Sequence, residues 1–402
     1  MEYKTYKLGT CFSLIENGAI IKQRKEAKGF PITRIETLSH GKFNRDKLGH
    51  ADIFDTTPYK RYILEDKDLI MSHINSRAFL GRTVLYRKKG NEQIIHGMNV
   101  LRIKTNEQFL DPVFASYLFK TSHFKKAIDS IRKDAINQSS INIFDICNIQ
   151  ISLPSITEQR KISHALQLID KKIETNHLIN DNLEAMAKQL YDYWFVQFDF
   201  PNEEGKPYKS SGGAMVWNEK LKREIPQGWS TLPISAILDK YSTTKRYETK
   251  EYLSQGKYPI IDQGDTYIVG YTNEDDNLLT RHPAVLFGDH STKVKFLDFD
   301  FARGADGTQI LYSSNDAVSQ YYLYLAVSTL QIPNPGYSRH FKYLKELPIA
   351  IPSLSIAIKF ANIVKPLFKK WTNNIFNNIA LTKQRDELLP LLMNGQASVN
   401  SD

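Results

Sequence analysis

The chain has 402 residues, of which 41% are hydrophobic and 24% are charged, and this length allows two or three domains with cores of their own. Only two cysteines occur, Cys11 and Cys147, which excludes a disulfide framework or a four-thiolate zinc site and indicates a reducing cytoplasm. Fifty-three lysines and arginines against 44 acidic residues leave a net charge of +9, which is compatible with a polyanionic partner such as nucleic acid.

The apolar stretches are too short for a membrane protein. The most suggestive one, 321–330, is about half as long as the roughly 20 residues that a membrane-spanning helix needs. The first residues, Met1 to Lys4, do not lead into an apolar signal segment. We therefore expect a cytoplasmic protein with no membrane contact.

Residues 1–155 are predicted to form the first folded domain. Strand-like runs such as 94–103 alternate with short helical patterns such as 111–131. Residues 226–352 have the same character, including the strand-like run 284–287. We interpret each region as a mixed α/β domain of the α+β class with a curved or partly closed sheet.

A long helix is predicted to follow the first domain, over residues 156–197. Apolar side chains and two asparagines recur there at alternating steps of four and three residues, which indicates a helix packed lengthwise on another helix. The positions of this seam are Ile162, Leu166, Ile169, Ile173, Asn176, Asn180, Leu183, Ala187, Leu190 and Trp194. Residues 198–225, rich in proline, glycine and serine, are predicted to link this helix to the second domain.

The chain repeats itself at an offset of 198 residues. Residues 149–156 resemble residues 347–354, and shorter similarities lie upstream at slightly larger offsets. Adding the offset to the helical seam gives a second seam and predicts a second long helix over 353–398. The chain is therefore predicted to be a tandem duplication in which each copy is a domain followed by a helix.

The two helices are predicted to form an intramolecular antiparallel coiled coil, which relates the two copies by a pseudo-twofold axis. Buried asparagines cost stability unless they pair, and they fix the register of such a seam. We assign this role to four asparagines and expect Asn176 to face Asn374; the four are Asn176, Asn180, Asn374 and Asn378. Pro366 is expected to bend or delay the second helix. In the alternative, each helix packs on its own domain.

Motifs for catalysis and for metal binding are missing from the sequence. It has no G-x-x-x-x-G-K-[ST] phosphate loop, no G-x-S-x-G elbow and no H-E-x-x-H pair. Residues 334–337, Asn-Pro-Gly-Tyr, come near the Asn-Pro-Pro-Tyr loop of amino-methyltransferases, but a simple turn is the better interpretation. The ten histidines do not show the spacing of metal ligands. We therefore predict no catalytic residue and no metal site.

Several stretches resemble the specificity subunit of type I restriction–modification enzymes. They are Leu-Pro-Ser-Ile-Thr-Glu-Gln-Arg-Lys-Ile at 153–162, Tyr-Trp-Phe-Val-Gln-Phe at 193–198, Glu-Ile-Pro-Gln-Gly-Trp at 224–229, and Val-Leu-Phe-Gly-Asp-His at 285–290 with Gly-Ala-Asp-Gly at 304–307. The resemblance covers essentially the whole chain. The start of the second helix departs from it, because 355–359 lacks the Glu-Gln of the first copy.

This resemblance implies a DNA-binding subunit without catalysis of its own. Two target-recognition domains, 1–155 and 226–352, would each read one half of a split double-stranded DNA sequence while the helices hold the halves apart. The helices would dock two modification subunits, which carry S-adenosylmethionine and methylate adenine N6. Restriction subunits with ATP and Mg²⁺ would join them in a complex for phage defence, and this chain itself would bind no cofactor.

Direct readout needs planar polar groups on loops, with lysine and arginine nearby for phosphates. In the first domain such residues follow strand-like runs or form a basic cluster, and the candidates are Arg34, Glu36, Ser72, His73, Asn75, Ser76, Arg77, Lys22, Arg24 and Lys25. In the second domain the corresponding candidates are Gln263, Asp265, Asp289, His290, Ser291, Thr292, Lys293, Lys245, Arg246, Tyr247 and Arg303. The parallel position of the turns at 72–77 and 289–293 is the main argument for them.

Two other interpretations stay open. The chain could be a non-enzymatic coiled-coil scaffold with two domains that bind peptides or sugars, although this gives no role to the duplicated polar turns. It could also be a self-contained restriction or modification enzyme, which needs a methyl-donor loop or a nuclease triad.

Overall fold

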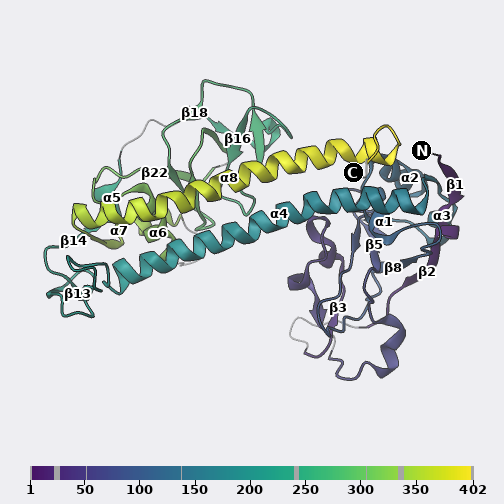
Figure 1. Ribbon diagram of the computed structural model, residues 1–402, viewed down its shortest axis with the longest axis horizontal. Coiled ribbons are helices and arrows are strands. Elements are labelled where there is room, and N and C mark those ends of the chain that lie inside the picture. The colour runs from purple at the N-terminus through teal and green to yellow at the C-terminus, as the bar shows by residue number, and fades with distance from the viewer. Residues whose placement is uncertain are drawn as a thin grey trace. The chain divides into compact units, whose positions relative to one another are not determined.

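The computed structural model describes residues 2–21, 28–50, 52–136, 138–239, 244–304, 306–333 and 339–399. It divides into unit 1, residues 1–173 and 380–402, and unit 2, residues 174–379. Two long helices, α4 (Ile156–Tyr191) and α8 (Leu354–Met393), each contribute one part to unit 1 and one part to unit 2 (Figure 1). Both units combine helices with sheets, which confirms the mixed α/β class.

Unit 1 is built around a four-stranded sheet of order β2-β8-β5-β7, and a separate antiparallel ladder joins β1 to β11. Alternate apolar residues of the sheet pack under the helices that follow it along the chain. Its elements are β1 (Lys4–Lys7), η1 (Leu8–Cys11), β2 (Phe12–Asn17), β3 (Pro31–Ile32), η2 (Ile35–Gly41), η3 (Arg45–Lys47), β4 (Gly49–His50), η4 (Thr57–Tyr62), β5 (Leu69–Ser72), β6 (Ile74–Asn75), β7 (Thr83–Leu85), β8 (Val100–Thr105), α1 (Pro112–Leu118), α2 (Ser122–Ile131), β9 (Lys133–Asp134), β10 (Ser139–Ser140), α3 (Ile143–Asn148) and β11 (Gln150–Leu153).

Unit 2 holds a three-stranded sheet β20-β19-β22, a five-stranded sheet built on β15-β21-β16-β17, and the ladder β14–β23. Its elements are the π-helical turn η5 (Asp192–Val196), β12 (Met215–Asn218), β13 (Arg223–Pro226), β14 (Ser230–Pro233), α5 (Ile234–Ile237), β15 (Arg246–Tyr247), η6 (Thr249–Glu251), β16 (Tyr258–Ile261), β17 (Gly270–Thr272), β18 (Leu278–Leu279), β19 (Ala284–Gly288), β20 (Val294–Leu297), β21 (Phe301–Gly304), β22 (Thr308–Leu311), α6 (Gln320–Thr329), α7 (Phe341–Glu346) and β23 (Pro348–Ile351).

The predicted duplication is visible in the elements themselves. Helix α7, strand β23 and the start of helix α8 each lie 198 residues after α3, β11 and the start of α4. In unit 1, β5 lies between β7 and β8; in unit 2, β19 lies in the same way between β20 and β22. The ladder β1–β11 that closes one copy has its counterpart in β14–β23. Each copy therefore has the same framework, as the internal repeat predicts.

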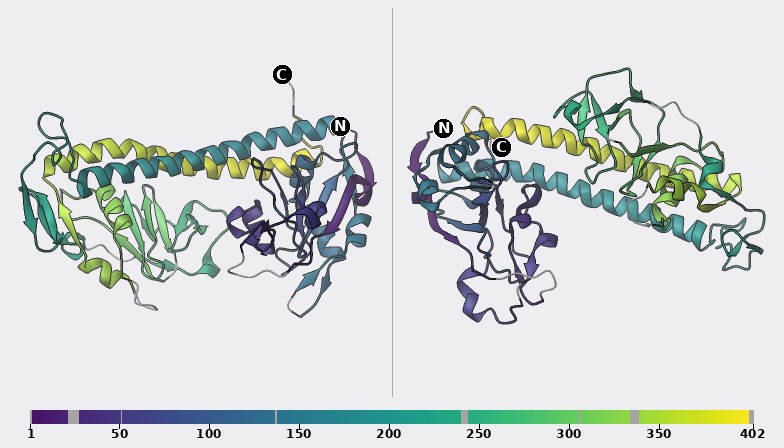
Figure 2. Two further views of the ribbon diagram at one scale, coloured as in Figure 1. Left: turned by 90° about the horizontal axis from the view of Figure 1, so that it is seen from below. Right: turned by 180° about the vertical axis from the view of Figure 1, so that it is seen from behind.

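Helices α4 and α8 run antiparallel within each unit, and Figure 2 shows them side by side in both views. In unit 1 the Arg385 guanidinium lies 2.8 Å from a carboxylate oxygen of Asp170, whose other oxygen accepts a 2.6 Å hydrogen bond from the Tyr117 hydroxyl. In unit 2 the π-helical turn η5 (Asp192–Val196), which continues α4, packs on the beginning of α8, where Trp194 lies against Phe360. The two helices therefore form the predicted antiparallel coiled coil, and their contacts are seen separately in each unit.

The seam asparagines are buried and paired, but with partners other than the one expected. Asn176 donates to Asn378 and Asn374 donates to Asn180, both over 2.8 Å, and Asn180 donates to the Trp371 carbonyl. The expected pairing of Asn176 with Asn374 is wrong. In antiparallel helices, the first asparagine of one helix meets the second asparagine of the other.

Pro366 does not delay the second helix. Helix α8 begins at Leu354, well before this proline, and continues to Met393. A proline inside a helix removes one backbone hydrogen bond, but neighbouring packing can outweigh that loss. Here the flanking side chains Val364 and Phe368 are buried in the largest apolar cluster of unit 2, so packing holds the helix through the proline.

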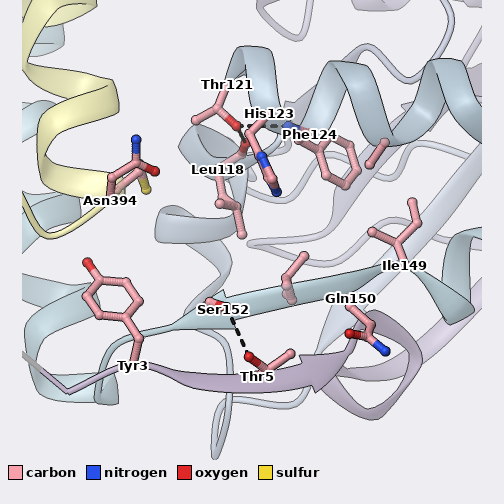
Figure 3. A pocket seen from close by; sticks show the side chains of 13 residues that line it. Tyr3, Thr5, Leu118, Thr121, His123, Phe124, Ile149, Gln150, Ser152 and Asn394 are labelled. Carbon is pink, nitrogen blue, oxygen red and sulfur yellow. Dashed lines mark hydrogen bonds between the residues drawn. The ribbon is translucent and has the colours of Figure 1, made fainter.

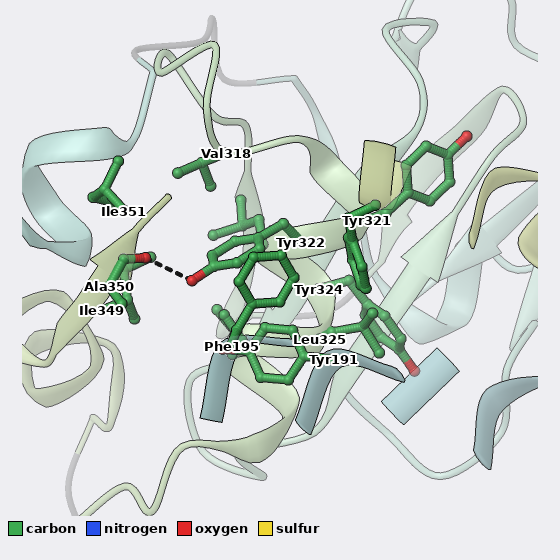
Figure 4. Close-up of a cluster of buried hydrophobic side chains, with 14 of the residues drawn as sticks. Tyr191, Phe195, Val318, Tyr321, Tyr322, Tyr324, Leu325, Ile349, Ala350 and Ile351 are labelled. Atoms are coloured by element: carbon green, nitrogen blue, oxygen red, sulfur yellow. Dashed lines mark hydrogen bonds between the residues drawn. The ribbon is translucent and has the colours of Figure 1, made fainter. Parts of the chain in front are cut away.

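The core of unit 2 is rich in aromatic side chains that come from the end of α4, from η5 and from α6, and β23 adds aliphatic side chains (Figure 4). Phe195 meets Tyr322 edge to face with ring centroids 4.7 Å apart. The Tyr322 hydroxyl donates a 2.6 Å hydrogen bond to the Ala350 carbonyl, so its polar end is satisfied inside the core. These contacts fix the end of α4 against the second domain.

The segment predicted as a linker is more ordered than its composition suggests. Strands β12 and β13 form a hairpin within it, and Phe200 stacks between Tyr208 and Trp229 with centroids 4.7 Å and 5.1 Å away. Its prolines and glycines therefore shape turns of a folded segment, because these three stacked aromatic rings hold that segment in place.

Candidate nucleic-acid interface

Two equivalent turns carry about half of the candidate DNA-contacting residues. In unit 1 the turn at 73–82 connects β5 to β7, and in unit 2 the turn at 289–293 connects β19 to β20. Both turns leave the central strand of the shared three-stranded framework, and every residue of β5 and β19 is buried. The sequence-based equivalence of the two turns is therefore matched by equivalent positions in the fold.

The unit 1 turn is divided into an inner and an outer part. Ser72 and His73 are buried, and burial lowers the pKa of His73. Asn75 donates to the Ser72 hydroxyl and accepts from the backbone N–H of Ser76, so it shapes the turn. Ser76 and Arg77 are exposed. The inner residues support the loop, and the outer pair is available to a ligand.

The other candidates of unit 1 lie on separate loops. Arg34 and Glu36 are exposed at the start of η2, and their charged groups are 3.7 Å apart. Part of the positive charge of Arg34 is therefore balanced on the protein itself. The candidates Lys22, Arg24 and Lys25 lie outside the described residues.

In unit 2 the side chain of Gln263 joins three loops. Its amide oxygen accepts from the backbone N–H of His290 over 2.9 Å, and its amide nitrogen donates to the Asp306 carbonyl over 2.7 Å. The Ser291 hydroxyl donates to the Gln263 carbonyl. The Gln263 amide already has partners on both sides, so it positions the turn and has little capacity left for a base edge.

Two glycines permit this close approach of the loops. A Cβ on Gly307, which has φ +81°, would lie 2.5 Å from the Gln263 amide nitrogen and 2.7 Å from the His290 ring. A Cβ on Gly288 would lie 2.1 Å from the Ser291 hydroxyl oxygen. Only glycine fits at both positions, because any side chain would push the turn away from Gln263.

Asp289 anchors the turn from inside. It is buried, and one carboxylate oxygen accepts a 2.8 Å hydrogen bond from the backbone N–H of Phe341 at the start of α7. Its carbonyl accepts from the backbone N–H of His340. Asp289 therefore ties the turn to the helix that precedes β23 and does not reach outward. Thr292 has a left-handed backbone, and its hydroxyl donates to the Ser291 carbonyl.

The exposed face of this loop cluster carries three cations and the His290 ring. Lys293 forms an ion pair with the exposed Asp265, and Arg246 forms one with Asp306. Arg339, which was not among the residues expected from the sequence, lies 3.9 Å from the same Asp306 carboxylate. In the sequence, only its position directly before the N-cap residue His340 of helix α7 could have pointed to it. Such exposed pairs are weak and exchange readily for phosphate.

The remaining candidates of unit 2 form contacts with other residues of the protein. Lys245 contacts both Glu251 and Glu274, and the hydroxyl of the buried Tyr247 donates to Glu274 over 2.7 Å. Arg303 is buried and donates to the Thr244 carbonyl. Tyr247 and Arg303 support the sheet next to the loop cluster, and the sequence could not show this because composition does not reveal burial. Lys245 stays partly exposed and is held by its two carboxylate partners.

The described residues hold neither a membrane-spanning helix nor a cluster of metal ligands. None of the described helices is long and apolar enough to cross a membrane. Among the same residues no group of three or more histidine, cysteine, aspartate and glutamate side chains could hold a metal ion. What the loops offer is a set of exposed hydrogen-bonding and cationic groups on a rigid framework, repeated once in each unit.

A family model described as the type I restriction modification DNA specificity domain matches residues 1–185 and 226–381. The chain belongs to this family. The two matched ranges are the two copies of the internal repeat, each with most of its long helix. The fold is also that of a solved relative: the crystal structure of a type I restriction-modification system S subunit from M. genitalium aligns over 100% of this chain and 97% of that chain, with a TM-score of 0.57 and 16% identity.

Two curated proteins of Methanocaldococcus jannaschii are similar in sequence. One, described as the MjaX type I restriction enzyme specificity subunit, is 32% identical over 233 residues, which are 58% of this chain and 52% of that protein. The MjaIX type I restriction enzyme specificity subunit is 27% identical over 311 residues, 70% of this chain and 68% of its own. The chain thus matches about half the length of the first relative.

Proposed function

We propose that this chain is the specificity subunit of a type I restriction–modification complex and that it reads a bipartite double-stranded DNA target, one half with each domain. The observation that carries the proposal is the pair of equivalent turns on β5 and β19, each with exposed polar or cationic side chains. Because the side chains on the two turns differ, the two domains would read different base sequences. The target would then be asymmetric.

The proposal assigns catalysis to partner subunits. Two modification subunits would dock on the long helices and bring S-adenosylmethionine for N6-adenine methylation, and restriction subunits would bring ATP and Mg²⁺. This chain would contribute recognition and binds no cofactor in this scheme. Support comes from the family model, from the names of the relatives, and from α4 and α8, which each take part in both units.

Duplex binding by the complex of this chain with its modification subunits tests the proposal. A competition gel-shift assay with fragments of the host genome should reveal one preferred sequence, and affinity should fall steeply with salt because phosphate contacts release counterions. Binding that is independent of sequence, or no binding at all, would favour a scaffold that binds other ligands.

A further inference from the structure

A groove of about 500 Å³ opens on unit 1 between the β1–β11 ladder, helix α2 and the end of helix α8 (Figure 3). Its floor is apolar and contains Phe124, Ile149, Ile151 and Met393, all of them buried. Its rim is polar and is formed by Tyr3, Thr5, Thr121, His123, Gln150, Ser152 and Asn394, so it includes no lysine, arginine, aspartate or glutamate. An open apolar floor with a rim of this composition suits a polypeptide better than a phosphate backbone.

The internal repeat identifies the matching place in unit 2. Tyr3 immediately precedes β1, and Trp229 immediately precedes β14. Met393, at the end of α8, lies 198 residues after Phe195. Both long helices end in similar backbone turns, in which Gln396 donates to the Leu391 carbonyl and Asp199 donates to the Tyr193 carbonyl. The turn after α4 is one residue longer, because the π-helical turn η5 precedes it. With this extra residue allowed for, the two helix ends can be compared through their residues of positive φ.

In unit 2 this place is covered by the chain that leaves helix α4. Phe198 and Phe200 lie on Trp229 with ring centroids 5.5 Å and 5.1 Å away. Arg223, from the same folded segment, donates to the Phe195 carbonyl over 3.3 Å. Phe198 keeps a left-handed φ of +65°, which is strained for a bulky residue, and its ring is buried. Packing of these rings on Trp229 outweighs that strain.

In unit 1 the corresponding turn residue is Gly395, with φ +70°. The described residues that follow it, 396–399, contain no aromatic side chain. Tyr3, the counterpart of Trp229, is only partly buried and borders the groove. In unit 2 the segment after the long helix is therefore seated through aromatic rings. In unit 1 the corresponding segment packs only Ala397 and Val399 on the core, and a groove stays open beside it.

We propose that this groove is a docking site for a partner polypeptide whose bound segment presents two aromatic side chains two residues apart, as Phe198 and Phe200 do in unit 2. The aromatic rings enter the apolar floor between Phe124 and Met393, and the backbone of the segment contacts the polar rim. Such a partner binds one end of the duplicated chain and distinguishes it from the other. The proposal does not depend on DNA binding.

A synthetic peptide with the sequence of residues 197–213 is the probe, because this segment contains Phe198, Phe200 and Tyr208 in their native order. Its binding to the full-length chain is measured by fluorescence anisotropy and by calorimetry. A second peptide carries Phe198→Ala and Phe200→Ala. The groove is blocked with Ser152→Trp, on the exposed rim, and the matched control is Lys4→Trp, an exposed residue of β1 that does not line the groove.

The native peptide should bind with saturation. The double-alanine peptide should bind at least about tenfold more weakly, since buried aromatic anchors dominate such contacts. Ser152→Trp should remove binding, whereas Lys4→Trp should leave it unchanged. Equal affinity of the two peptides, absence of binding, or unchanged binding to Ser152→Trp would overturn the proposal. So would concentration-dependent dimerisation abolished by Ser152→Trp, which would make a second copy of the chain the occupant.

A photo-reactive benzophenone at the position of Phe200 provides a second readout that does not depend on a variant. The cross-link should map to residues 118–127 or 149–152, which line the groove. Cross-links confined to unit 2 would show that the peptide only replaces its own native copy, and would contradict the proposal.

Discussion

Asn374 donates its side-chain amide to Asn180 across the two long helices of unit 2, over 2.8 Å, and both side chains are buried. One helical turn away, Asn176 makes the same kind of bond to Asn378. Each bond is possible only when the two helices are antiparallel and in this register, because a shift would leave buried amides without partners.

The first prediction concerns this asparagine pair. Asn374→Leu should lower the free energy of unfolding by about 1–3 kcal/mol, because the buried Asn180 oxygen loses its donor. The double variant Asn180→Leu with Asn374→Leu should recover most of the loss, since two leucines suit an apolar seam. Urea unfolding followed by circular dichroism measures both. Equal stability of parent, single and double variants would show that the pair does not hold the register.

The second prediction concerns the Gln263 brace. Gln263→Glu replaces the donor that faces the Asp306 carbonyl with an acceptor, so the turn at 289–293 should lose its support. We expect binding to one half of the DNA target to weaken by about tenfold, equivalent to roughly 1.4 kcal/mol, with the other half unaffected. Competition gel shifts with duplexes altered in one half measure this.

Asp265→Asn is the control for that experiment. Asp265 is exposed, and its contact is the ion pair with Lys293, so this variant tests charge near the loop without removing the brace. Equal losses for Gln263→Glu and Asp265→Asn would show that the Gln263 amide does not position the turn.

The third prediction concerns lysine and arginine side chains that differ in exposure and in the number of their carboxylate partners. Arg246→Ala and Lys293→Ala should each reduce the slope of log affinity against log salt by about one, if each side chain contacts one phosphate. Lys245→Ala is the matched control, because its side chain is less exposed than those of Arg246 and Lys293 and its ammonium group contacts two carboxylates, Glu251 and Glu274. A titration of duplex binding against potassium chloride gives the slopes. An equal change for all three variants would contradict the assignment.

The fourth prediction is a pH dependence of unit 1. Burial of His96 lowers its pKa from 6.5 to about 4, and its Nε2 lies 2.7 Å from the Val100 carbonyl. The unfolded chain therefore binds a proton more readily than the folded one, and stability is lost as pH falls from about 6.5 towards 4, by up to roughly 3 kcal/mol. Urea unfolding at pH 7 and pH 4.5 should show a smaller loss for His96→Gln than for the parent. Identical losses would assign the acid sensitivity to other groups.

Much of the framework follows from the sequence because it repeats. The offset of 198 residues predicts the second helix, and the structure places β23 and the start of α8 at that distance from β11 and the start of α4. Periodicity is a strong signal over long helices. The internal repeat also indicates which two turns are equivalent, since each of them follows a buried central strand.

Burial and pairing could not be predicted in this way. Ser72 and Asp289 belong to polar turns by sequence, but tertiary contacts place both inside the protein. The partners of Asn176 depend on the register of two helices that the sequence does not align. The order of the segment after helix α4 depends on Trp229, which lies about thirty residues after Phe198 and Phe200. In each case a contact between distant residues decides the outcome.

A map of adenine methylation in cells that carry this chain and its modification subunits tests the central claim most directly. The account predicts one bipartite motif, with two specified parts separated by unspecified bases. Exchange of residues 226–352 for the corresponding domain of a relative should change one part and preserve the other. A contiguous motif, or an exchange that alters both parts or neither, would contradict recognition of one half by each domain.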